Sequence, residues 1–158
     1  MKGRVWKFGD NVDTDQIIPA EYLVTGDPKE LARYAFCKVR GEFAKEVREG
    51  DIIVGGSNFG SGSSREHAPR ALIGAGISCV IAASFARIYF RNSINIGLPP
   101  IECKIRAEDG DILEVDLGKG LIRNTTSGES FNFKPLPGFL QEMVDAGGLI
   151  EWLRSKPQ

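Results

Sequence analysis

The segment 51–84 constrains the fold of this chain more than any other. "DIIVGG" (51–56) is typical of a short apolar strand bounded by glycines, and "HAPRALIGA" (67–75) has the apolar spacing of a helix. "ISCVIAAS" (77–84) is typical of a buried strand. Pro69 is compatible with the helix because it falls in the first turn, where its missing N–H costs nothing. A strand, a glycine-rich loop, a helix and a second strand predict a layered α/β domain.

The N-terminal segments predict a strand, a loop and a short helix. "GRVWKF" (3–8) alternates like a strand, and "NVDTDQIIP" (11–19) is expected to be a loop. "DPKELARYAF" (27–36) has the start signals of a helix, with Asp27 as the cap and Pro28 in the first position.

The second half of the chain predicts a helix at 85–97 that ends at a glycine, and then a strand at 98–105. Residues 111–133 predict two or three antiparallel strands, and two short helices are expected at 137–148 and 149–154. The helix at 137–148 is expected to stop at Gly147. Its large apolar side chains are expected to point inward: Phe139, Leu140, Met143 and Val144. The antiparallel strands follow a part of the chain in which strands and helices alternate, and this order still fits a layered α/β domain. Ligands gather at the carboxyl ends of strands in such domains, so the loop after 51–56 is the expected functional feature.

Composition and charge exclude several function classes. Of 158 residues, 42% are hydrophobic and 26% are charged, which is ordinary for a globular protein with a core. The net charge is −1 and both signs are scattered, so no nucleic-acid or membrane partner is expected. The N-terminus lacks an apolar signal core and no apolar run approaches membrane-spanning length, so we expect a cytoplasmic protein.

The three cysteines do not predict a disulfide or a metal site. Cys37, Cys79 and Cys103 are far apart, and they match neither a disulfide framework nor a zinc or iron–sulfur spacing. Cys79 falls in the apolar run 77–84, so we expect it to be a small core residue.

The glycine-rich loop at 57–66 fits none of three known motifs. Ser61 stands where a phosphate-binding P-loop needs lysine, and Arg65 stands where a dinucleotide fingerprint needs its third glycine. No serine has glycines two positions before and two positions after it, as a nucleophile elbow requires.

Two interpretations of the loop stay open on these residues alone. Ser63 or Ser64 caps the following helix while Arg65 is solvated, or the hydroxyls, the guanidinium and backbone N–H groups converge on a carboxylate or another small anion. His67 lies four positions after Ser63 and would share its helical face, but a single histidine at a helix start is more often a structural hydrogen-bonding residue. We expect that structural role for His67.

Three segments together carry a family resemblance. "DNVDTDQIIPAEYL" (10–23), "GSNFGSGSSREHAPRAL" (56–72) and "FARIYFRNSINIGLP" (85–99) resemble the small subunits of isopropylmalate dehydratase (isopropylmalate isomerase), in the aconitase superfamily. The resemblance implies a swivelling β/β/α domain similar to domain 4 of aconitase, as a single domain over residues 1–158. This agrees with the layered α/β prediction.

The resemblance also implies roles for the loop. Ser63 corresponds to the catalytic base, which removes a proton from the carbon beside a carboxylate; Arg65 corresponds to the arginine that binds substrate carboxylate, and Ser64 helps to hold the substrate. A serine hydroxyl is a very weak acid, so a positive charge and helix N-terminal dipoles must favour its alkoxide. Arg65 and the N–H groups of the glycine loop are suited to supply both.

The same resemblance implies that this chain needs a partner. Such enzymes use a [4Fe–4S] cluster as a Lewis acid on the leaving hydroxyl, and cysteines at defined spacing hold it. This chain lacks that spacing. The cluster is therefore expected on a separate large subunit, no cofactor is expected on this chain, and the chain alone should be inactive.

The family's specificity loop corresponds here to "EYLVTG" (21–26), so the substrate-facing candidates are Leu23, Val24 and Thr25. Aconitase and homoaconitase relatives carry an arginine for the extra substrate carboxylate where Val24 stands. Burying an isopropyl group on Val24 would gain about 2–3 kcal/mol, whereas an unpaired carboxylate there would be costly. An alternative is that residues 22–24 only anchor an apolar loop.

The expected function is the interconversion of 2-isopropylmalate and 3-isopropylmalate in leucine biosynthesis, by a hydro-lyase active only with its large subunit. Two alternatives stay open. One is the small subunit of a homoaconitase or a citramalate-type (methylmalate-type) hydro-lyase, since Thr25 could bond a polar group. The other is a non-catalytic anion-binding module of the same fold.

Overall fold

The computed structural model describes residues 1–157 and builds them around one seven-stranded sheet, with the strand order β4-β3-β2-β1-β5-β6-β7. Four strands are parallel to one another: β1 (Lys2–Lys7), β2 (Ile52–Gly55), β3 (Cys79–Ala82) and β4 (Pro100–Glu102). Three more continue the sheet as antiparallel strands: β5 (Ile112–Asp116), β6 (Leu121–Asn124) and β7 (Ser130–Asn132). β1 joins the two parts, because residues 2–4 pair with β5 and residues 5–7 pair with β2.

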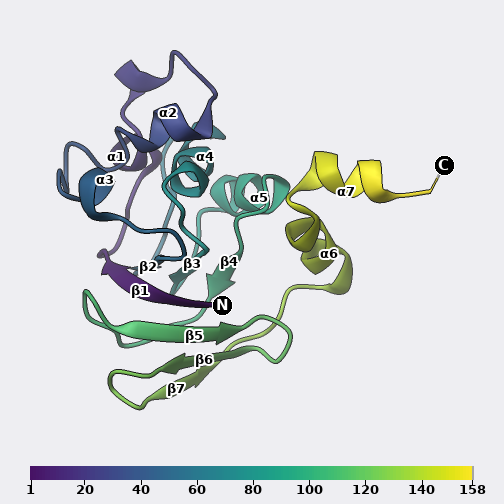
Figure 1. The fold of residues 1–158 in the computed structure, drawn as a ribbon. Helices are drawn as coiled ribbons and strands as arrows, with labels where there is room; N and C mark the ends of the chain where they lie inside the picture. Colours follow the sequence, from purple (N-terminus) through teal and green to yellow (C-terminus); the bar gives the residue numbers. More distant parts are fainter. Residues whose placement is uncertain (158) are drawn as a thin grey trace.

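Side chains alternate across the parallel strands and so create two apolar layers. Ile53 and Val80 belong to the core under the helices, whereas Ile52 and Cys79 belong to a second core that includes Leu113 of β5. Figure 1 shows the matching arrangement, with α1 to α5 on one side of β1–β4 and with β5–β7 curled along the other. The predicted layered α/β fold is confirmed as a β/β/α stack.

The helices are short and cover one side of the parallel strands and one end of the molecule. They are α1 (Thr14–Ile17), the 3₁₀ helix η1 (Ala20–Tyr22), α2 (Pro28–Ala32), α3 (Phe43–Glu46), α4 (His67–Gly74), α5 (Arg87–Asn95), α6 (Gly138–Ala146) and α7 (Leu149–Ser155). The predicted cap of α2 is confirmed, since the Asp27 side chain accepts from the Lys29 N–H. Gly147 ends α6 in the left-handed conformation, as expected. No helix within residues 1–157 is long and apolar enough to cross a membrane.

Two sequence predictions were wrong. The expected loop at 11–19 contains α1, because Asp13 and Gln16 form a reciprocal capping box that stabilises even one turn. Phe139 does not point inward: it is 59% exposed, in the first turn of α6. Only the stripe of α6 that faces α5 and α7 is covered, and Met143 and Val144 occupy it beside Ile94.

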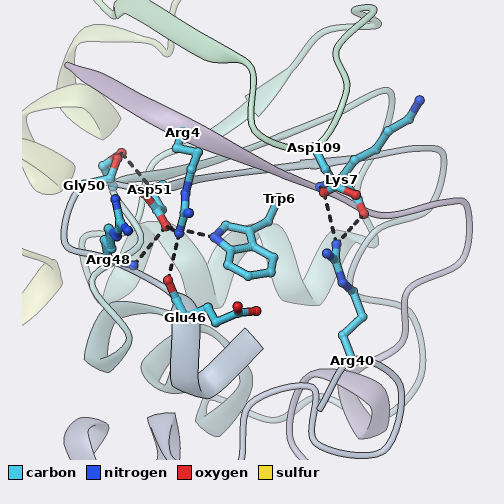
Figure 2. A network of polar contacts seen from close by, with 10 residues as sticks. Arg4, Trp6, Lys7, Arg40, Glu46, Arg48, Gly50, Asp51 and Asp109 are labelled. Atoms are coloured by element: carbon cyan, nitrogen blue, oxygen red, sulfur yellow. Dashed lines mark hydrogen bonds and ion pairs between the residues drawn. The ribbon is translucent and has the colours of Figure 1, made fainter. Parts of the chain in front are cut away.

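Polar networks tie the helical layer to the start of β2 and the end of β1 (Figure 2). The buried Asp51 carboxylate, only 4% exposed, accepts from Trp6 Nε1 at 2.8 Å, Arg4 Nη2 at 3.0 Å and the Arg48 N–H at 2.9 Å. Arg40 Nη1 donates to Asp109 Oδ1 at 3.1 Å and to the Lys7 carbonyl. Asp51 precedes β2, so its network lies at the opposite end of this strand from the glycine-rich loop.

Candidate active site

The glycine-rich loop leaves the carboxyl end of β2 and enters α4, with two glycines in the left-handed region. Gly60 has φ +85° and Gly62 has φ +89°. A Cβ at Gly60 would lie 2.2 Å from the ring of Tyr89, which packs edge-on against Phe59. At this point the loop backbone lies directly on an aromatic core, which fixes its path.

Gly60→Ala should therefore lower the free energy of unfolding by about 2–5 kcal/mol, combining the left-handed backbone cost with overpacking against Tyr89. Gly128→Ala is the matched control: Gly128 has φ +83° and nothing within 4 Å of the added Cβ, so only the backbone cost of about 1–2 kcal/mol remains. Urea unfolding of the purified chain measures both values. Equal losses in the two variants would contradict the close packing.

Residues 12–14 run beside the loop and hold it. The Gly60 N–H donates to the Val12 carbonyl at 2.7 Å, and the Thr14 N–H donates to the Ser61 carbonyl at 2.8 Å. Thr14 Oγ1 also donates to the Ser63 carbonyl at 2.9 Å. Sequence reasoning missed this role of Thr14, and the capping box at Asp13 and Gln16 is the signal that could have indicated it.

The serine pair does not cap α4, so the capping interpretation was wrong. Glu66 occupies the N-cap position without a side-chain cap bond, and α4 begins only at His67. Ser63 and Ser64 are exposed, and their hydroxyls and backbone N–H groups make no hydrogen bond within residues 1–157. Both residues are thus free to contact a molecule outside the chain.

His67 is half-buried, and no side-chain hydrogen bond in the described part of the chain involves it. The expected structural hydrogen bond is therefore absent from residues 1–157. Ser63 lies before the helix begins, so the two residues do not share a helical face, and the Ser–His pairing has no geometric basis.

Arg65 points its guanidinium toward α1 without forming a hydrogen bond there. Its side chain is 24% exposed, and Nη1 lies 3.5 Å from Asp15 Oδ1. Nη1 is nevertheless buried without a hydrogen-bond partner among residues 1–157. A buried guanidinium N–H without a partner is costly, and a carboxylate oxygen is the partner that best relieves this cost.

The predicted specificity loop at 21–26 is anchored at its start and exposed at its tip. Tyr22 stacks on Tyr34 with ring centroids 4.1 Å apart, and Leu23 packs against the core under the helices. Val24 is 92% exposed, and Thr25 Oγ1 accepts from the Asp27 N–H at 3.1 Å. The anchoring interpretation therefore holds for Tyr22 and Leu23 but not for Val24.

The specificity loop and the glycine-rich loop both lie next to α4. A methyl group at Gly26 would lie 3.1 Å from Arg70 Nη1, while Arg70 Nη2 pairs with the Glu66 carboxylate at 3.3 Å. No hydrogen bond or ion pair within residues 1–157 joins Val24 to Ser63 or to Arg65.

Comparison with known proteins places this chain in a family. The aconitase C-terminal domain model matches residues 40–106. The small subunit of 3-isopropylmalate dehydratase from Methanosarcina acetivorans is 62% identical over 156 residues, which cover 98% of this chain and 96% of the relative. The chain belongs to the 3-isopropylmalate dehydratase small-subunit family. The predicted resemblance is thus confirmed.

Other members of the family extend the comparison. The isopropylmalate/citramalate isomerase small subunit from Methanocaldococcus jannaschii is 58% identical over 159 residues, covering 99% of this chain and 95% of the relative. A crystal structure of 3-isopropylmalate dehydratase from the same organism matches with a TM-score of 0.93 at 49% identity, covering 97% of this chain and 92% of that one. The swivel-type fold expected from the sequence is therefore shown by structure as well.

In this small-subunit family member, Ser63 and Ser64 are exposed at the surface, whereas Arg65 is half-buried beside them. Five hollows of the described chain, of about 260 to about 490 Å³, are lined by residues other than Ser63, Ser64 and Arg65. A site that excludes water from a proton transfer must enclose the reacting groups, whereas Ser63 and Ser64 are exposed in the described chain.

The cysteines are placed as separate thiols. Cys79 is buried in β3 as expected, and burial raises the pKa of its thiol to about 12. Cys37 and Cys103 are half-buried elsewhere. Within residues 1–157, no group of three or more His, Cys, Asp or Glu side chains is arranged to hold a metal ion.

Proposed function

We propose that this chain is the catalytic-base subunit of an isopropylmalate isomerase, a hydro-lyase, and that it completes an active site with a large subunit. One observation carries the proposal: Ser63 and Ser64 are exposed and their hydroxyls make no hydrogen bond within residues 1–157, beside Arg65, whose buried Nη1 lacks a hydrogen-bond partner there. Residues 1–158 would act as one swivel domain. The reaction belongs to leucine biosynthesis, which we place in the cytoplasm.

Ser63 is proposed to take the proton from the carbon beside a substrate carboxylate and to return a proton in the hydration step. Arg65 binds that carboxylate, and its positive charge also favours the Ser63 alkoxide. Ser64 donates a hydrogen bond to the substrate. The N–H groups of residues 63–65, which make no hydrogen bond within residues 1–157, add positive potential before α4, which supports the same roles.

The [4Fe–4S] cluster of this chemistry is proposed to lie on the large subunit. The three cysteines here do not form a ligand set, because Cys79 is enclosed in the sheet as a neutral thiol and the other two are free and half-buried. Accordingly, this chain's part is limited to binding the carboxylate, orienting the substrate and moving the proton.

We propose 2-isopropylmalate as the substrate because Val24 offers an apolar, uncommitted side chain at the tip of the specificity loop. Leu23 and Thr25 would flank it. An isopropyl group buried against Val24 gains about 2–3 kcal/mol, and a carboxylate would find no cation on this residue. Citramalate is a second candidate, since the Methanocaldococcus jannaschii relative carries citramalate in its name and a methyl group fits the same apolar surface.

The test is an anaerobic assay of the chain reconstituted with a cluster-bearing large subunit, with isopropylmalate, citramalate and homocitrate as substrates. We expect isomerisation of isopropylmalate, weaker turnover of citramalate and none of homocitrate. A complex that prefers homocitrate would reject the substrate assignment. Calorimetry on the chain alone separates the other alternative: tight dicarboxylate binding without a partner, together with an inactive complex, would indicate a non-catalytic anion-binding module.

Val24→Arg should shift the ratio of kcat/KM for homocitrate to that for isopropylmalate by at least about tenfold, because the new cation pairs with the extra carboxylate while the apolar contact is lost. Val39→Arg is the control, since Val39 is also an exposed valine and lies outside the specificity loop. An unchanged substrate ratio in Val24→Arg would remove this loop from the specificity argument.

A further inference from the structure

Thr14 is a buried polar residue in contact with the candidate active site. Only 3% of it is exposed, although it begins a helix of one turn near the surface. Its hydroxyl donates to the Ser63 carbonyl at 2.9 Å, and its N–H donates to the Ser61 carbonyl at 2.8 Å. The hydroxyl and the N–H of Thr14 thus both donate to the glycine-rich loop.

These two bonds lie on either side of Gly62. Gly62 has φ +89° and is exposed, and the atoms nearest to its Cβ position belong to Asp13 and Thr14, at 3.5 Å. An exposed glycine leaves the backbone free to rotate. The two Thr14 bonds fix the carbonyls of the preceding and following residues, so they determine how the chain presents Ser63.

The position of Thr14 after the capping box explains why its N–H is available to the loop. Asp13 is the N-cap and binds the Gln16 N–H, while Gln16 Oε1 accepts from the Asp13 N–H. Thr14 follows in the first helical position, where the N–H has no acceptor inside the helix. Its N–H is therefore available for the Ser61 carbonyl without loss of a helix hydrogen bond.

We propose that Thr14 is a positioning residue for proton transfer by Ser63. This rests on the proposed function, because it assigns Thr14 the task of orienting the Ser63 hydroxyl toward the substrate carbon. Thr14 holds the Ser63 backbone and makes no bond to Arg65, so it acts on the geometry of the base and not on carboxylate binding. A misplacement of about 1 Å in a reacting group can cost about 100-fold in rate.

The test uses three variants in the reconstituted complex. Thr14→Val keeps the shape and removes the hydroxyl donor; Thr14→Ser keeps the donor and removes the methyl group. Thr125→Val is the matched control, because Thr125 Oγ1 also donates to a backbone carbonyl, that of Ile112 at 3.1 Å, but lies in the β6–β7 turn. If Thr14→Val does not assemble, Thr14→Ala takes its place with the same expectation.

We expect Thr14→Val to lower kcat by about 10- to 100-fold with KM within about threefold of wild type, and Thr14→Ser to recover most of kcat. Thr125→Val should match wild type. Backbone ¹⁵N relaxation of the full chain should show lower order parameters at residues 62–64 in Thr14→Val only. A wild-type kcat in Thr14→Val, or an equal loss in Thr14→Ser, overturns the proposal.

The controls separate this proposal from the function on which it rests. If the wild-type complex is active and Ser63→Ala is not, a normal Thr14→Val rejects only the positioning role. If the wild-type complex does not isomerise isopropylmalate, the proposed function fails, and the catalytic role of Thr14 fails with it. If Thr14→Val leaves the order parameters at residues 62–64 unchanged, the Thr14 hydroxyl does not hold the loop, and the positioning role is rejected independently of any activity measurement.

Discussion

Ser63→Ala is expected to lower kcat of the assembled enzyme by about 10²- to 10⁴-fold, the usual contribution of a positioned base, while KM changes by less than about threefold. The serine side chain is exposed and makes no hydrogen bond within residues 1–157, so its removal disturbs no contact of the fold. The loss should therefore appear in the proton-transfer step alone. Steady-state kinetics of the anaerobic complex with isopropylmalate measures it.

Two further serine substitutions, one beside Ser63 and one far from it in the chain, show whether the effect is specific. Ser64→Ala removes a proposed substrate contact and should mainly raise KM. Ser127→Ala lies in the β6–β7 turn, where the hydroxyl only accepts from the Glu129 N–H at 3.3 Å, and should leave both constants unchanged. A fully active Ser63→Ala complex would show that another group is the base and would end the present assignment.

The strands could be predicted because their patterns depend on local properties. The apolar runs around Ile53 and Val80 became β2 and β3, and the alternating run around Trp6 became β1. The sequence did not reveal that β1 pairs with β5 along its first half and with β2 along its second. Such pairing depends on contacts between residues far apart in the chain, which no local pattern encodes.

The helices also divide into features that local sequence predicts and features that depend on distant contacts. Asp27 and Pro28 marked the start of α2 because capping chemistry is local. The exposure of Phe139 was missed because the orientation of α6 depends on its packing against α5 and α7. Helix α1 was missed although Asp13 and Gln16 are its capping-box residues, because the sequence pattern of a single capped turn resembles that of a loop.

In the candidate site, sequence reasoning selected the loop, and the structure changed the choice between interpretations. The residue types at Ser63, Ser64 and Arg65 suited either a helix cap or an anion site. The start of α4 at His67 removed the first interpretation. The burial of Arg65 Nη1 and the bonds from Thr14 were not predictable, because they join residues about 50 positions apart in the chain.

Arg65→Gln is expected to lower kcat/KM for isopropylmalate by about 30-fold or more. A charge-assisted hydrogen bond to a carboxylate lost from a partly buried site costs about 2–5 kcal/mol, and each 1.4 kcal/mol is tenfold. Most of the loss should appear in KM, because the guanidinium is proposed to bind the carboxylate in substrate and transition state alike. Some loss in kcat should follow, since the same charge is proposed to support the Ser63 alkoxide.

The fold should tolerate this change. Arg65 makes one ion pair in the described chain, at 3.5 Å to an Asp15 carboxylate that is 62% exposed, and such pairs contribute at most about 1 kcal/mol. Arg70→Gln is the matched control, since Arg70 also pairs with one carboxylate, that of Glu66 four positions earlier. It should keep kcat/KM within about threefold, because its partner is one helical turn away and nothing assigns it to the substrate.

Thermal unfolding of both variants, beside their kinetics, decides between a binding role and a structural role for Arg65. A binding residue gives a large kinetic loss with a transition temperature close to wild type. A large fall in that temperature, or equal kinetic losses in Arg65→Gln and Arg70→Gln, would show that the guanidinium supports the loop instead. In that case the missing hydrogen bond at the buried Nη1 would be only a cost to the stability of the isolated chain, and the large subunit would have to bind the substrate carboxylate.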